Sequence, residues 1–209
     1  MTPTLTLTAT GLPPGEASAV RDHRQQPIRN NPMNLAIRKA KIEDAGAIAH
    51  VQVESWKTTY VGIVPDVFLA SLNQEDRMRN WREQILADNI SIFVAEDETG
   101  IFGFVAGGEI REKLEEYDAE LYAIYLLRER QRQGVGGTLC LALASALQTS
   151  GFTSMVVWVL EQNPSVSFYQ RLGAVQIARK VIDIGGDDLQ ELAFGWPSLD
   201  RLIAAGNQG

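Results

Sequence analysis

The stretch from Arg128 to Cys140, RERQRQGVGGTLC, places three glycines and several long polar side chains directly before an apolar helical pattern. Upstream lies the strand-like run AELYAIYLL (119–127), and apolar residues recur at every fourth position from Val135 to Leu147. A strand that leads through a glycine-rich loop into a helix exposes backbone N–H groups at the positive end of the helix dipole. The stretch therefore predicts an anion-binding corner between a strand and a helix.

Two common phosphate-binding loops do not fit these letters. A Walker loop, GxxxxGK[ST], needs Lys before Ser or Thr, and no such pair follows the glycines. The dinucleotide pattern GxGxxG fails because residues 134–139 are GVGGTL. What remains is Q-x-x-G-x-G at Gln131, Gly134 and Gly136, which alone is as typical of a flexible turn as of a phosphate site.

The rest of the chain alternates between strand and helix patterns. This order predicts a mixed α/β (α+β) sheet with helices on both faces. The expected strands are 35–40, 91–97, 101–110, 119–127, 153–161 and two near the C-terminus around Gly185–Gly186; the expected helices are 43–56, one from Pro65, 74–86, one from Val135, and 165–172. The polar run REKLEEY (111–117) predicts a connection between two strands.

Length and composition indicate one main domain. The chain has 209 residues, of which 45% are hydrophobic, enough for a single core. Residues 1–32 are rich in Thr, Pro and Gly, so we expect a flexible N-terminal extension. We place the domain at 33–200 and a C-terminal tail at 201–209.

Charge and cysteine content exclude several classes of function. The formal net charge of −7 argues against binding to nucleic acid or to an anionic membrane. Cys140 is the only cysteine and there are two histidines, so we expect no disulfide framework and no metal site. No apolar run is long enough to span a bilayer, and the composition favours a cytoplasmic protein.

Three segments together resemble the GNAT superfamily of N-acetyltransferases. The loop matches motif A of that family, [RQ]-x-x-G-x-[GA], IRKAKIEDAGAIAHV with SWKTTYVGIVP resembles its opening strand and helix, and NPSVSFYQRLGA resembles a later segment. The resemblance covers about residues 35–196. It implies a mostly antiparallel sheet with a splayed central strand pair, and acetyl-CoA as the acyl donor without a metal.

The resemblance also implies which residues contact coenzyme A. The strand before the loop would pair with the pantetheine arm, the loop would hold the pyrophosphate through its N–H groups, and the later segment would add a contact near the pantetheine. The residues concerned are Ile124, Tyr125 and Leu126 on the strand, Gln131, Arg132, Gln133, Gly134, Val135, Gly136 and Gly137 in the loop, and Asn163. From the letters alone, the strand residues also fit an ordinary buried strand, and Asn163 fits a turn or helix cap.

The expected catalytic residues are Tyr169 and Glu120. Within NxxxxFY, the resemblance makes Tyr169 a general acid beside the thioester sulfur, although a phenol in a short helix is more often a core residue. Glu120 would be the general base, with Asp118 in reserve; a charge at a strand edge explains Glu120 equally well. Trp56 and Tyr60 resemble the family's substrate wall, with core packing as the alternative for Trp56.

The function implied is acetyl transfer from acetyl-CoA to a primary amine, a small molecule or a peptide N-terminus, in a ternary complex. A non-catalytic acyl-CoA sensor of the same fold is the alternative, and nucleotide binding by the loop is a third reading of the pattern. Members of the family are commonly dimeric, so the resemblance leaves a homodimer open beside a monomer.

Overall fold

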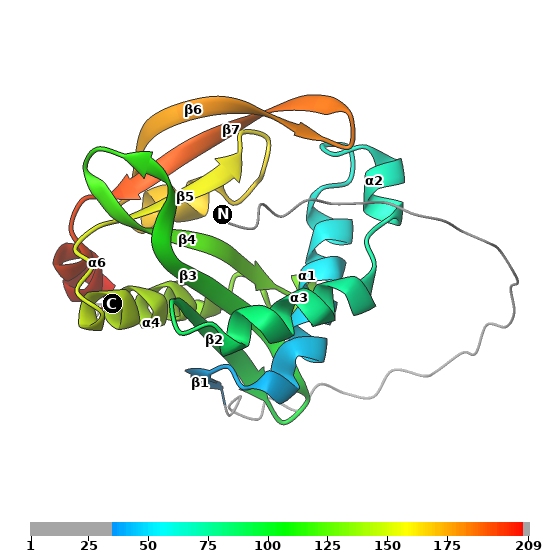
Figure 1. Ribbon diagram of the computed structural model, residues 1–209, viewed down its shortest axis with the longest axis horizontal. Coiled ribbons are helices and arrows are strands. Elements are labelled where there is room, and N and C mark those ends of the chain that lie inside the picture. Colours follow the sequence, from blue (N-terminus) through cyan, green and yellow to red (C-terminus); the bar gives the residue numbers. More distant parts are fainter. Residues whose placement is uncertain (1–34, 207–209) are drawn as a thin grey trace, which may run out of the picture. The chain divides into compact units, whose positions relative to one another are not determined.

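The computed structural model describes residues 35–206 (Figure 1). The extension predicted at residues 1–32 lies outside these described residues. Within them, seven strands form one sheet in the order β1-β2-β3-β4-β5-β7-β6. The strands are β1 (Ala36–Lys39), β2 (Ile90–Asp97), β3 (Gly100–Leu114), β4 (Tyr117–Leu126), β5 (Met155–Leu160), β6 (Val175–Ile184) and β7 (Asp187–Trp196). Every neighbouring pair is antiparallel except β4 and β5, which confirms the predicted mixed, mostly antiparallel sheet.

Helices cover the sheet and connect its strands. They are η1 (Ile42–Asp44), α1 (Ala45–Thr59), α2 (Asp66–Ala70), α3 (Gln74–Leu86), η2 (Arg128–Arg130), α4 (Val135–Thr149), α5 (Val166–Arg171) and α6 (Leu199–Gly206). Helix α4 buries the predicted stripe from Val135 to Leu147 against the sheet. Helices α1 and α3 contribute to a second core, in which Trp81 packs edge-on against Phe104 of β3. The sheet therefore carries a separate apolar core on each face.

The central strands β4 and β5 separate after a short paired stretch. Their pairing covers only 119–121 of β4 against 155–157 of β5, and beyond it the two strands diverge (Figure 1). We call this divergence of residues 122–126 from residues 158–160 the splay. It begins at a bulge, where Tyr122 is an extra residue between the pairs Gly107–Leu121 and Ala106–Ala123. A bulge increases local twist, which turns β4 away from β5.

Gly107 makes this bulge compatible with tight packing. A Cβ at Gly107 would lie 2.6 Å from the carbonyl oxygen of Glu120 and 2.8 Å from a methyl group of Leu143 on α4. Only glycine therefore allows β3 to approach both β4 and α4 this closely.

Two segments differ from the sequence prediction. The polar run 111–117 is not only a connection, because β3 continues to Leu114 and β4 already begins at Tyr117. The segment expected to be a tail from residue 201 belongs in part to α6, whose Leu199 and Leu202 are buried. Alternating charges on an exposed hairpin end hide its strand character, and a short helix carries too few residues to show a clear period.

Candidate active site

A cavity of about 620 Å³ opens at the splay. Its walls include 121–126 of β4, 157–159 of β5, Asn163, and Phe168, Tyr169, Arg171 and Leu172 at the end of α5. Beyond Leu121, β4 has no strand partner on the side of β5. The backbone groups of β4 that face this side are thus available to an extended ligand, as in strand addition at a sheet edge.

The glycine loop forms one end of this cavity. Gln131, Arg132, Gly134, Gly136 and Gly137 line it, whereas Val135 is buried in the core. Arg132 and Gly134 have left-handed backbones, with φ of 60° and 83°. Within residues 35–206, the N–H groups of 132–136 have no hydrogen-bond partner. Free N–H groups at the start of a helix, here the 15-residue α4, are able to bind an anion.

Side chains of the loop hold its shape more than they add charge. The side-chain amide of Gln131 donates to the carbonyl oxygen of Leu126 at 3.0 Å, and that of Gln133 donates to the carbonyl oxygen of Glu129 at 3.1 Å. Arg130 pairs with Asp97 at 2.8 Å. The expected role of Gln133 as a backbone donor is compatible with its side-chain contact. The expectation does not hold for Gln131 or Gly137, because their N–H groups already donate to the carbonyl oxygens of Arg128 at 3.3 Å and of Gly134 at 3.0 Å.

Tyr169 lies on α5 and lines the cavity while only 5% of its surface is exposed. Its ring packs among Phe168, Phe194 and Trp196. Burial raises the pKa of Tyr169 well above the ordinary value, and the nearby Tyr125 adds to this rise. The phenol is therefore protonated at neutral pH, which is the form that can donate a proton.

A hydrogen-bonded group of side chains joins α1 to the splay. The Asn163 amide donates to the hydroxyl of Tyr60 at 2.9 Å, and its carbonyl oxygen accepts from the N–H of Ser165 at 2.8 Å. The Trp56 indole donates to the hydroxyl of Tyr125 at 2.9 Å. Burial raises the pKa of Tyr60, with a further contribution from Tyr125. Asn163, Tyr60 and Trp56 were predicted from the sequence as site residues. Tyr125 was also predicted, but only for a contact through its backbone, and the role of its side chain was not expected.

The structure does not bring Glu120 or Asp118 to the cavity wall. Glu120 is 1% exposed, and both its oxygens accept hydrogen bonds from Arg111, including one from its backbone N–H at 3.1 Å. Burial lowers the pKa of Arg111, but Glu120 outweighs this effect and the net shift is upward. Asp118 binds the N–H and hydroxyl groups of Thr153 and Ser154 at 2.8–2.9 Å. Both carboxylates are occupied by structural contacts.

Trp158, near the cavity, was not singled out from the sequence. Glu191 was expected only as part of an acidic group with Asp183, Asp187 and Asp188, which could attract a polyamine, an aminoglycoside or a peptide N-terminus but is more often solvated surface. Trp158 of β5 lines the cavity, and its buried indole N–H is the one side-chain polar atom in residues 35–206 that is buried without a partner. Glu191 of β7 lies directly opposite Leu160 of β5. Trp158 stands in the unbroken apolar run MVVWVL of β5, which gives no signal that separates it from core residues.

Two further properties concern the described residues as a whole. No group of three His, Cys, Asp or Glu side chains between residues 35 and 206 is placed to bind a metal ion. None of the helices in that range combines the length and the apolar character needed to cross a membrane.

Comparison with known proteins identifies the family. A model of the FR47-like protein family matches residues 99–182. The uncharacterized N-acetyltransferase YuaI of Bacillus subtilis is 47% identical over 80% of this chain and 96% of its own length. Spermidine N(1)-acetyltransferase of Thermoplasma acidophilum is 31% identical over 75% of this chain and 94% of its own length. The crystal structure of a PaiA N-acetyltransferase from the same organism, in complex with coenzyme A, matches with a TM-score of 0.61 and 29% identity, covering 77% of this chain and 98% of that one. The chain belongs to the GNAT superfamily of N-acetyltransferases.

Proposed function

We propose that the protein transfers the acetyl group of acetyl-CoA to a primary amine by direct attack in a ternary complex. The observation that carries this proposal is the cavity at the splay, which joins an unpaired strand edge, a row of free N–H groups and a buried phenol. The coenzyme A complex of the related PaiA protein and the name of the spermidine acetyltransferase support the donor and the kind of acceptor.

The residues present fit an extended ligand with an anionic end. The N–H groups of 132–136 would hold the pyrophosphate. The edge of β4 beyond Leu121 would pair with the amides of the pantetheine arm, except for the Leu126 carbonyl, which already accepts from Gln131 and Ser55. Asn163 would lie beside that arm, fixed by its bonds to Ser165 and Tyr60. When bound, acetyl-CoA supplies the activated acetyl thioester.

Tyr169 is our assignment for the general acid. In the transfer, the amine nitrogen forms a bond to the acetyl carbon, the carbon–sulfur bond breaks, the nitrogen loses one proton and the sulfur gains one. The buried phenol of Tyr169 keeps its proton until a thiolate develops beside it. Tyr60 accepts a hydrogen bond from Asn163, and Trp56 donates one to Tyr125. Tyr60 and Trp56 would form the wall that positions the amine.

We assign Glu120 a positioning role in place of the general base expected from the sequence. Glu120 holds Arg111, whose guanidinium lies 4.4 Å from the ring centre of Tyr122, and Tyr122 lines the cavity. A carboxylate bound this way supports the wall of the cavity and has no free oxygen directed at an acceptor.

The test is release of free coenzyme A thiol with a panel of amines, beside thermal shifts with coenzyme A, ATP and NAD. We expect amine-dependent thiol release and stabilisation by coenzyme A that exceeds that by either nucleotide. Stabilisation by coenzyme A with no amine turned over, and Tyr169→Phe equally inert, would establish the sensor function instead. Equal stabilisation by ATP or NAD would favour nucleotide binding.

A further inference from the structure

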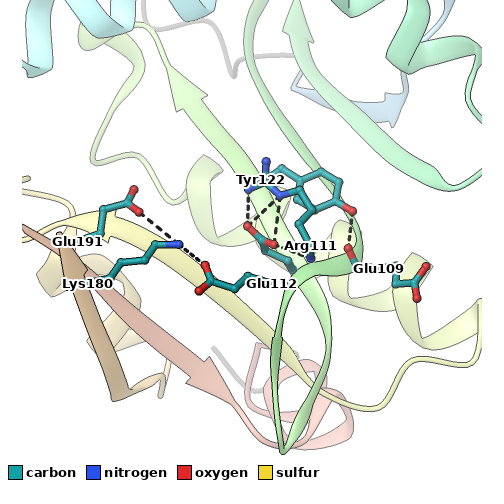
Figure 2. Close-up of polar contacts among 7 residues, drawn as sticks. Glu109, Arg111, Glu112, Tyr122, Lys180 and Glu191 are labelled. Carbon is teal, nitrogen blue, oxygen red and sulfur yellow. Dashed lines mark hydrogen bonds and ion pairs between the residues drawn. The ribbon is translucent and has the colours of Figure 1, made fainter. Parts of the chain in front are cut away.

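A cluster of five charged side chains lies on the sheet. Arg111, Glu112, Lys180 and Glu191 of this cluster are labelled in Figure 2. Arg111 and Glu112 come from β3, Glu120 from β4, Lys180 from β6 and Glu191 from β7. Three carboxylates thus face two cations, so the cluster carries one uncompensated negative charge at neutral pH. Of the three carboxylates, Glu120 and Glu191 are largely shielded from water, and such charge is costly unless a cation balances it.

Glu191 is the carboxylate that lacks close compensation. Glu120 binds Arg111 through several hydrogen bonds, and Glu112 forms a close ion pair with Lys180. The Glu191 carboxylate is 4.0 Å from the Lys180 ammonium and accepts no hydrogen bond from residues 35–206, although its side chain is only 19% exposed. Burial raises the pKa of Glu191, and the neighbouring cations only partly oppose this rise.

Glu191 does not line the cavity itself, but it lies next to residues at the amine end of the proposed site. It lies directly opposite Leu160 in the β5–β7 pair, so its side chain is on the same face as Leu160 and as Trp158 two residues earlier. Leu160 packs in one cluster with Tyr60. The negative charge of Glu191 contributes to the raised pKa of Tyr125, after the larger effect of burial. The carboxylate therefore lies close to the residues that we assign to the acceptor wall.

Lys180 shows that an ammonium group fits between the ring of Trp158 and the carboxylate of Glu191. The ammonium of Lys180 lies 3.9 Å from the centre of the Trp158 ring, between Glu112 and Glu191 (Figure 2). An aromatic face next to a carboxylate is a typical binding site for alkylammonium ions. Trp158 also lines the cavity, so one side chain contacts both the Lys180 ammonium and the site of transfer.

We propose that Glu191 and the ring of Trp158 form a subsite for a second positive charge on the acceptor, so that the enzyme selects diamines and polyamines over monoamines and amino acids. This inference rests on the proposed acetyl transfer. Lys180 is a built-in competitor, because its ammonium occupies the same aromatic face and shares the same carboxylate.

Three acceptors of matched length test the proposal: putrescine, n-butylamine and γ-aminobutyrate. With the wild type, we expect kcat/KM for putrescine to exceed that for the other two by about tenfold or more. Glu191→Gln should raise KM for putrescine about tenfold with little change in kcat, and should leave n-butylamine unaffected. The matched control is Glu112→Gln, which removes the more exposed carboxylate of the same cluster and should change kcat/KM for putrescine by less than about threefold.

Two more variants distinguish recognition from a structural role. Lys180→Met should lower KM for putrescine, since it removes the competing ammonium. Glu191→Lys should reverse the preference toward γ-aminobutyrate. Glu191→Gln should unfold at the same temperature as the wild type or higher, because it removes a poorly compensated buried charge.

Equal losses for all three acceptors in Glu191→Gln, or a wild type without preference for putrescine, would overturn the subsite. A binding measurement distinguishes failure of the subsite from failure of acetyl transfer. The quantity measured is the thermal shift that putrescine causes in the presence of coenzyme A. If no acceptor is turned over but putrescine stabilises the wild type and not Glu191→Gln, the subsite stands and the transfer reaction fails. If turnover occurs and this difference is missing, the subsite fails alone.

Discussion

The hydroxyl of Tyr169 has a buried position that suits a proton donor, and its removal gives a direct test. Burial keeps the phenol protonated at every pH below the ordinary value of about 10, so Tyr169→Phe removes a donor that is fully available at neutral pH. We expect kcat to fall about a hundredfold, with an unchanged dissociation constant for coenzyme A. Steady-state kinetics and calorimetry measure the two quantities. Tyr117→Phe, on β4 outside the cavity wall, is the control, and a Tyr169→Phe enzyme with wild-type kcat would refute the assignment.

Single residues also show how much of the candidate site could be predicted from the sequence. The motif around Asn163 and Tyr169 pointed to two residues that line the cavity, because a short local pattern fixes both. The prediction of Glu120 as a base selected a residue on the right strand, but the spacing along the chain could not reveal Arg111. That arginine meets Glu120 across the hairpin of β3 and β4, and the hairpin was expected to be only a polar connection. The sequence placed Glu191 in an acidic group with Asp183, Asp187 and Asp188, but it could not separate Glu191 from the other three, because only the fold shows which carboxylates the cations leave uncompensated.

The loop between β4 and α4 depends on a left-handed residue, which gives a prediction for this element. A Cβ at Gly134 or at Gly173 would meet nothing within 4 Å, and both have φ near 80°, so alanine should cost about 1–2 kcal/mol at each through backbone strain alone. Only Gly134→Ala should also weaken coenzyme A binding, by about tenfold, because it turns N–H groups away from the anion site. Thermal unfolding and calorimetry test this pair. Equal affinity of the two variants for coenzyme A would show that the loop does not bind the pyrophosphate.

At the scale of elements, strong periodic patterns were predictable and local irregularities were not. The stripe of α4, helix α3 and the hairpin of β2 and β3 followed from period and turn residues. The splay depends on the bulge at Tyr122, which arises from pairing between strands and leaves little trace in one strand alone. Its sequence signal is the pair Gly107–Gly108, whose meaning becomes clear only when β4 and α4 are seen to pack against it.

The whole domain should lose stability in acid through an ion-pair network that joins β1, η1 and β2. Arg38 binds Asp44 at 2.6 Å and Glu96 at 2.7 Å, and it lowers the pKa of both carboxyl groups. A lowered pKa in the folded state adds stability above the ordinary values of about 4, and this stability is lost as the pH falls through the lower folded values.

The corresponding variant is Arg38→Met. We expect it to lower the free energy of unfolding by about 1–3 kcal/mol at pH 7 and by much less in acid, where the wild type has lost the same contribution. Denaturant unfolding at a series of pH values measures the difference. Arg79→Met removes an exposed pair with Asp76 and should cost about 0.5 kcal/mol or less. A difference between wild type and Arg38→Met that stays constant from neutral to acid pH would contradict this role.

The central claim concerns the molecule as a catalyst, namely that donor and acceptor meet in the cavity at the splay and react directly. Initial velocities with acetyl-CoA and the best amine varied together test it most directly. Direct transfer in a ternary complex predicts intersecting double-reciprocal lines, with N-acetylated product and free coenzyme A formed in equal amounts. Parallel lines, which indicate an acetylated enzyme, or coenzyme A release that does not depend on the amine, would contradict it.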